Sequence, residues 1–187
     1  MSLETTWQKA QQVRELFRPI EQKRWGSREY AVELMVQVGH LGDILLLQDY
    51  KMNRNTDEAN RKIIGDEIVD IILNTFSIAD AEGISLPSML SIKAENSPWI
   101  EIIEDSLVIY PDPIDPITLY SELSMKGAAV LRSLVSSALG ENLTESLLTI
   151  TRLLARFAGI YGIDIDTAFT LMYGESQLFV KRYSNAK

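Results

Sequence analysis

The chain has 187 residues, which fits one compact domain or two small ones. Its 26 acidic and 18 basic residues give a net charge of -8, which argues against general nucleic-acid binding, because phosphate contacts need clustered lysine and arginine. The absence of cysteine excludes disulfides, zinc–thiolate sites and thiol nucleophiles. No run of about 18 apolar residues occurs, and the first residues do not resemble a secretory leader. We therefore expect a soluble, cytoplasmic protein without a membrane span.

The apolar residues recur mostly with helical periodicity, which predicts an all-α fold. Pro19 interrupts the first expected helix, Ser27 and Thr56 are candidate caps, and Gly83 is a natural helix stop. In chain order, the expected helices cover residues 4–18, 28–50, from Thr56 to Gly83, 86–95, 117–139, 144–161 and 166–183.

Residues 96–116 break this pattern because they contain four of the six prolines. Proline removes a backbone donor and disfavours helix at the residue before it, so we expect a connector there. Between the prolines, the segments WIEII and SLVIY flank Glu104 and Asp105. This arrangement predicts a short β-hairpin.

Two parts of the sequence resemble each other. Residues 66–86 align with 145–165 without a gap, and 32–45 align with 121–134. We interpret this as a degenerate tandem repeat of helical units. The alternative is that amphipathic helices resemble one another through composition alone. The predicted organisation is a first unit over 1–97, a proline-rich connector over 98–116 and a second unit over 117–187.

Glu67 and Asp70 are the first candidate site residues. They are three residues apart, so they share one face of the third expected helix and can reach one cation. Hard cations such as Mg²⁺ prefer oxygen ligands. Most such pairs are solvated surface residues, but this one leads directly into the apolar run 71–73, which places it near an inter-helix groove.

The second expected helix carries a polar strip on an otherwise apolar sequence. Its members are Glu33, Gln37, His40 and Asp43, and Glu33 and His40 differ by roughly 20° around the helix axis. A short loop joins the second and third helices, so antiparallel packing would set this strip against the carboxylate pair.

These residues form part of a wider resemblance. QVGHLGD at 37–43, DEIVDIIL at 66–73 and EGISL at 82–86 follow a lead-in with a tryptophan, Trp25. Residues 11–96 thereby resemble the MazG-like all-α nucleoside-triphosphate pyrophosphohydrolases, which include dCTP pyrophosphatases and dimeric dUTPases. The resemblance implies a MazG-like four-helix bundle that hydrolyses a nucleoside triphosphate to a monophosphate and pyrophosphate with Mg²⁺ or Mn²⁺.

The resemblance also implies roles for single residues. The family's ExxD motif maps onto Glu67 and Asp70, which would be metal ligands and catalytic groups. The family's ExxE motif maps onto Gln37 and His40, so two carboxylates are missing. His40 favours softer metals than Mg²⁺. Glu33, one turn before Gln37, and Asp43, one turn after His40, would assist His40 in holding the metal.

Four further residues are expected to contact substrate. These are Trp25, Asn74, Lys93 and Asn96. For Trp25 the alternative is an ordinary packing residue, and for Asn74 it is a buried amide with its hydrogen bonds satisfied.

The second copy carries no acids at the corresponding positions. Ser146 and Thr149 replace the ExxD pair, and Lys126 and Ala129 stand at the ExxE positions. We expect a structural role, in which the second copy takes the place of a partner subunit. The chain would then form an intrachain pseudo-dimer or a homo-oligomer.

Three functions remain open from the sequence. The first is a metal-dependent nucleotide pyrophosphohydrolase, favoured by the intact ExxD pair. The second is a catalytically impaired relative with a binding or assembly role, favoured by the loss of the ExxE acids. The third is a helical bundle unrelated to nucleotides.

Overall fold

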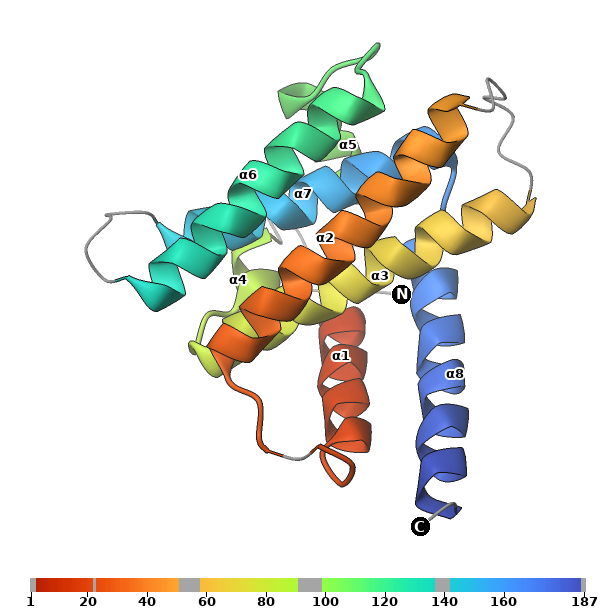
Figure 1. Ribbon diagram of the computed structural model, residues 1–187. Helices are drawn as coiled ribbons and strands as arrows, with labels where there is room; N and C mark the ends of the chain where they lie inside the picture. The colour runs from red at the N-terminus through yellow and green to blue at the C-terminus, as the bar shows by residue number, and fades with distance from the viewer. Residues whose placement is uncertain (1–2, 22, 51–57, 91–98, 137–141, 186–187) are drawn as a thin grey trace.

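The computed structural model describes residues 3–21, 23–50, 58–90, 99–136 and 142–185. Within these residues there are eight helices and no strand, which confirms the all-α prediction (Figure 1). The helices are α1 (Leu3–Phe17), α2 (Ser27–Tyr50), α3 (Glu58–Ala81), α4 (Leu86–Leu90), α5 (Trp99–Ile109), α6 (Pro116–Val135), α7 (Leu143–Tyr161) and α8 (Ile165–Asn185).

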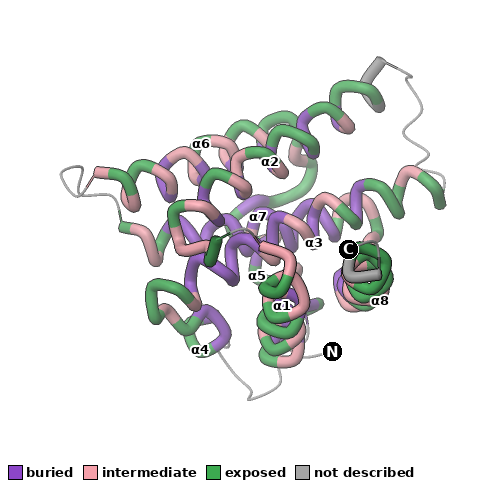
Figure 2. Tube along the Cα trace, turned by 60° about the horizontal axis from the view of Figure 1, so that its bottom comes forward, coloured by how far each residue is buried: buried purple, intermediate pink, exposed green. Residues whose placement is uncertain are grey.

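The helices α2, α3, α6 and α7 form the central bundle. α2 packs against α3 and α6, and α7 packs against α3, α5 and α6. Figure 1 shows that α2 and α3 run in opposite directions, as expected from their short connection. Buried residues are concentrated along α3 and α7, which lie in the middle of the molecule (Figure 2). Apolar residues on all sides of these two helices are therefore removed from water.

α3 and α7 end in the same way. Gly83 and Gly162 have positive φ angles of 70° and 62°, which glycine adopts without steric cost. The amide after each glycine bonds back to the last helical turn: Ile84 to Ala79 O and Ile163 to Ala158 O, both at 2.8 Å. This left-handed cap satisfies carbonyls that the helix end would leave unpaired. The gapless alignment of 66–86 with 145–165 pairs these positions, although the division into two repeated units stays a prediction.

The predicted β-hairpin is wrong. Residues 99–109 form the helix α5, whose buried Trp99, Ile102 and Ser106 follow helical spacing. This face packs against α7, and the Trp99 indole N–H donates to Thr6 Oγ1 at 3.0 Å. Glu104 and Asp105, expected at a turn, instead lie on the exposed outer side of the helix. Burial of one helical face outweighs the strand preference of the β-branched residues.

The other boundaries follow recognisable end signals. Asp115 caps α6, because its side chain accepts a hydrogen bond from the Thr118 amide, and Pro116 stands at the first turn. Asn142 caps α7 by accepting from the Glu145 amide. The expected cap Thr56 and the ends of the expected helices at 91–95 and 137–139 lie outside the described residues.

α8 leaves the bundle at the α7–α8 corner, where the chain bends by 103°. It then extends along α1 (Figure 1), with Lys9 Nζ donating to Thr170 Oγ1 at 3.0 Å. Near its far end, the rings of Phe17 and Phe179 lie 6.0 Å apart. α8 therefore covers only part of α3, which is important for the cavity described below.

One segment of α2, Ser27–Leu47, is long and apolar enough to cross a membrane, and the bent pair α7–α8 would be a second candidate if it counted as one span. α2 buries Leu34, Leu41 and Leu45 within the bundle. A core helix of a soluble protein has the same composition, so this signal is weak.

Candidate active site between α2 and α3

Glu67 and Asp70 lie on α3 immediately before the fully buried Ile71 and Ile72. Glu67 is mostly buried, with 18% of its side chain exposed, and it faces α2, where His40 Nδ1 lies 3.8 Å from Glu67 Oε2. The structure thus confirms that the polar strip on α2 faces this part of α3.

The strip on α2 is held together by hydrogen bonds. Gln37 Nε2 donates to Glu33 Oε1 at 2.8 Å, and His40 Nδ1 lies 3.1 Å from Gln37 Oε1. An amide oxygen can only accept, so Nδ1 of His40 must carry the proton. Each end of the Gln37 amide therefore has one partner, and its oxygen would have to share a lone pair or give up the His40 bond to coordinate a cation.

The carboxylates around Asp70 repel one another when they are ionised. Burial, and after it the neighbouring negative charges, raise the pKa of Asp70 to about 7. These charges belong to Asp66, Glu67 and Glu33. Burial and the charge of Asp66 also raise the pKa of Glu67, although His40 opposes this shift. This part of the α2–α3 interface thus concentrates negative charge, of which the carboxyl of Asp70 is poorly solvated.

Glu67 also has an unsatisfied atom. Its Oε2 is buried and accepts no hydrogen bond in the described structure. Buried carboxylate oxygens ordinarily have donors, so an orphaned one is a sign of a missing ligand. Within the described residues, however, no three His, Asp or Glu side chains are arranged to hold a metal ion. Glu67 and Asp70 fit a cation by charge and by their free oxygens, but side-chain rotation is needed to gather a third ligand.

Other residues expected at the site lie elsewhere or are engaged. Asp43 is exposed, one turn beyond His40. Asn74 is 6% exposed and donates through Nδ2 to Asp70 O at 2.9 Å, which matches the alternative of a satisfied buried amide. Lys93 and Asn96 lie outside the described residues.

Trp25 precedes α2 and packs edge-on against Tyr30, with ring centroids 5.6 Å apart. Tyr30 in turn is covered by the guanidinium of Arg14, 5.2 Å from its ring centroid. Thirteen residues of helix, about 20 Å of rise, separate the start of α2 from His40. The structure therefore does not bring Trp25 together with His40, and it places the indole in a packing cluster.

The equivalent positions of the second copy carry no acid and are buried or half-buried. Ser146 and Thr149 are buried on α7, and Thr149 Oγ1 donates to Glu145 O at 2.8 Å. At the other two positions, Ala129 is buried and Lys126 is half-buried on α6.

Sequence reasoning missed two charged residues. Asp66 belongs to the electrostatic cluster, and its spacing of four residues from Asp70 was the available signal. Arg156 is only 3% exposed on α7, where it binds Tyr110 O and Asp112. Its position inside the apolar run LLARFAG was the corresponding signal.

No family model, no curated protein and no solved structure matches the chain.

Proposed function

We propose that this protein is a divalent-metal-dependent nucleoside-triphosphate pyrophosphohydrolase. The observation that carries the proposal is the Asp70 carboxyl, whose pKa is raised to about 7 among the charges of Asp66, Glu67 and Glu33. Burying like charges together is unfavourable, and a bound cation relieves both the repulsion and the loss of hydration. Strongly shifted carboxyl groups in a groove are typical of functional sites.

In this proposal Glu67 and Asp70 bind Mg²⁺ or Mn²⁺, with Glu33, His40 and Asp43 at the margin. The metal would supply polarisation of the phosphoryl oxygens. A bound cation would keep Asp70 in its charged form, and a carboxylate beside the metal can accept a hydrogen bond from the attacking water and orient it. Water would add at the α phosphorus, the bond from that phosphorus to the α–β bridging oxygen would break, and pyrophosphate would leave the nucleoside monophosphate.

The second candidate is a catalytically impaired relative with a binding or assembly role. The amide of Gln37, which takes the place of a family acid, already hydrogen-bonds Glu33 and His40. A neutral amide engaged by its neighbours attracts a metal ion less than a carboxylate would. For either candidate we keep the proposals of a cytoplasmic location and of pairing, within the chain or between copies.

The test combines a pyrophosphate-release screen over common NTPs and dNTPs with calorimetric titration of Mg²⁺ and Mn²⁺. Asp70→Ala should abolish metal binding. The double variant Gln37→Glu/His40→Glu should bind Mg²⁺ on the order of tenfold more tightly, because it adds two anionic ligands. Glu82→Ala, which removes an exposed acid just beyond α3, is the control and should change neither quantity.

The outcomes separate the two candidates. Pyrophosphate release that is lost in Asp70→Ala supports the hydrolase. If no triphosphate is cleaved and the double variant gains no Mg²⁺ affinity, the groove is not a degenerate metal site and the non-catalytic role is correct.

A further inference from the structure

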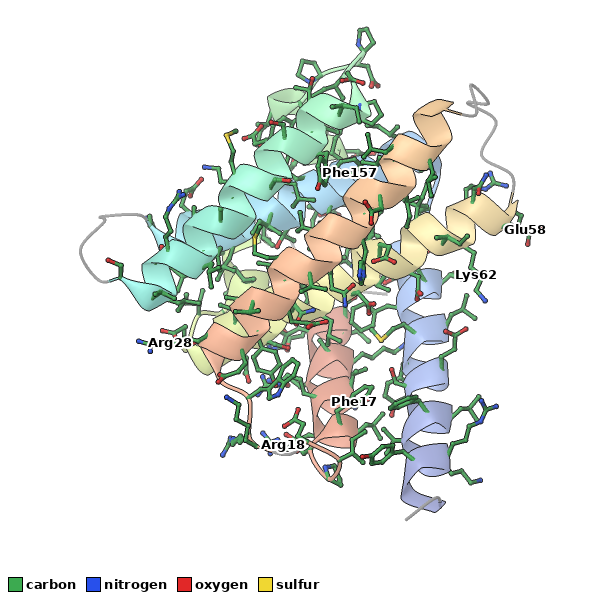
Figure 3. All side chains as sticks on the ribbon, in the orientation of Figure 1. Phe17, Arg18, Arg28, Glu58, Lys62 and Phe157 are labelled. Atoms are coloured by element: carbon green, nitrogen blue, oxygen red, sulfur yellow. The ribbon has the colours of Figure 1, made fainter. Side chains whose placement is uncertain are left out.

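A cavity of about 600 Å³ lies between the first half of α3 and the beginning of α8. Much of its wall is apolar, formed by Ala59, Gly65, Ile163, Ala168 and Leu171. In Figure 3, Glu58 and Lys62 mark its α3 side, opposite the upper part of α8. Its volume falls in the range of small-molecule sites.

The corner between α7 and α8 creates this cavity. α8 bends away by 103° and so leaves the first turns of α3 partly uncovered. At the floor, the α3 backbone passes close to the corner at Gly65, where an added Cβ would lie 3.4 Å from Ile163 Cγ2 and 3.5 Å from Ala168 Cβ. Because Gly65 and Ala168 have small side chains, α3 packs closely against the α7–α8 corner there, and the space beside this contact stays open.

Most polar groups around the cavity already have partners. Asp164 caps α8 by accepting from the amides of Asp166 and Thr167. Lys62 Nζ lies 3.5 Å from Glu175 Oε1. Asp66, in contrast, accepts no hydrogen bond from the described residues, although it lines the same cavity. Glu58 is a second such carboxylate at the start of α3, and Asp66, two turns further along, is the one nearer to Asp70.

Asp66 also connects the cavity to the carboxylate cluster. Asp66 and Asp70 are one turn apart on the same face of α3, with about 6 Å of rise between them. The charge of Asp66 is the largest electrostatic influence on Asp70 after burial. A ligand with a flat apolar ring in the cavity and an anionic end pointing along α3 would therefore be directed toward Asp70, where a bound cation would link the anionic end to the carboxylate.

Building on the proposed hydrolase function, we propose that the α3–α8 cavity binds the nucleoside part of the substrate and that Asp66 accepts a hydrogen bond from an exocyclic amino group of the base. A carboxylate selects such an amino group over a carbonyl, since two acceptors repel each other. The preferred substrates are then cytosine or adenine nucleotides, and uracil and hypoxanthine nucleotides are disfavoured.

The test uses nucleosides without metal, in the presence of a chelator, so that neither hydrolysis nor the metal site is needed and no phosphate is repelled by the carboxylates. Cytidine is compared with uridine, and adenosine with inosine, because each pair differs by an amino group in place of a carbonyl and by the proton on the adjacent ring nitrogen. Calorimetry should show the amino member of each pair binding on the order of tenfold more tightly. Asp66→Asn should remove or reverse this preference, because an amide can also donate.

Leu171→Glu tests the cavity itself. Leu171 is 49% exposed in the cavity wall, so a charge is tolerated by the fold but should weaken the binding of all four nucleosides at least about tenfold. Leu178→Glu is the matched control, since Leu178 is 55% exposed on the same helix outside the cavity. It should leave binding unchanged.

The two proposals fail in different ways. If the nucleosides bind with the amino preference but no triphosphate yields pyrophosphate, this site stands and the hydrolase proposal fails. If pyrophosphate is released while Asp66→Asn and Leu171→Glu leave KM and base preference unchanged, the nucleoside binds elsewhere and this inference is wrong. Absence of any nucleoside binding at millimolar concentration also overturns it.

Discussion

α3 and α7 occupy the middle of the bundle, end in the same left-handed glycine cap and each bury charged or polar groups. On α7 the buried Arg156 donates through Nε to Tyr110 O at 2.9 Å and also binds Asp112. The hydroxyl of Thr149 is satisfied by its own helix. On α3 the carboxyl of Asp70 lies among like charges, and Glu67 Oε2 has no hydrogen-bond partner in the described structure.

The difference separates a buried charge that has its partners from one placed among like charges. Removing a buried charge whose partners are present destabilises the fold, because those partners are left unpaired. A buried charge among like charges costs stability, so the fold would gain by losing it. The following predictions test whether Arg156 and Asp70 indeed fall on opposite sides of this division.

The largest effect is expected at Arg156. Arg156→Met should lower the free energy of unfolding by about 4 kcal/mol, because the Tyr110 carbonyl loses its buried partner. Chemical denaturation measures this change. Arg152→Met, one turn earlier on α7, should stay within about 0.5 kcal/mol of the wild type. Equal effects of the two substitutions would show that the Arg156 contacts are dispensable.

At Asp70 the sign should reverse. In chelator at pH 8, Asp70→Asn should raise the free energy of unfolding by about 3 kcal/mol, because the neutral amide avoids the cost of a buried charge. Thr149→Val, at the equivalent position of α7, should change it by less than about 0.5 kcal/mol, since that hydroxyl bonds only within its own helix. Destabilisation by Asp70→Asn would place this carboxylate in the same class as Arg156.

The dependence of the free energy of unfolding on pH should reflect the titration of Asp70. The pKa of Asp70 is about 7 in the folded protein and 3.8 ordinarily, so the folded state binds more protons between these values. The free energy of unfolding should therefore fall by up to about 3 kcal/mol as pH rises from 4 to 7, and level off above pH 7. Denaturation at several pH values should show this slope in the wild type. If Asp70→Asn retains the slope, another group causes it.

The smallest effects concern the feature that the two helices share. Gly83→Ala and Gly162→Ala should each lower the free energy of unfolding by about 1 kcal/mol, because both glycines have positive φ angles that alanine adopts with strain. The two losses should be similar, because an added Cβ would meet no other atom within 4 Å at either position. Gly174→Ala, within α8, should instead stabilise by up to ~1 kcal/mol. Thermal denaturation compares the three variants, and clearly unequal costs at Gly83 and Gly162 would mean that the caps differ energetically.

The local pattern was sufficient for most of the secondary structure. Periodicity predicted α2, α3, α6, α7 and α8, and the stops at Gly83 and Gly162 follow from the conformations that glycine alone tolerates easily. The sequence also indicated that the polar strip of α2 would meet Glu67, because helical spacing and a short connection leave few ways to pack two helices.

Tertiary packing decided the remainder. α5 is a helix because α7 offers an apolar surface for one helical face, which no local propensity for strand could reveal. The engagement of Gln37 by two neighbours depends on side-chain positions, and the cavity beside Asp66 depends on the angle at which α8 leaves α7. Periodicity fixes which face of a helix is apolar, but burial, pKa and cavity volume arise only when faces from distant parts of the chain meet.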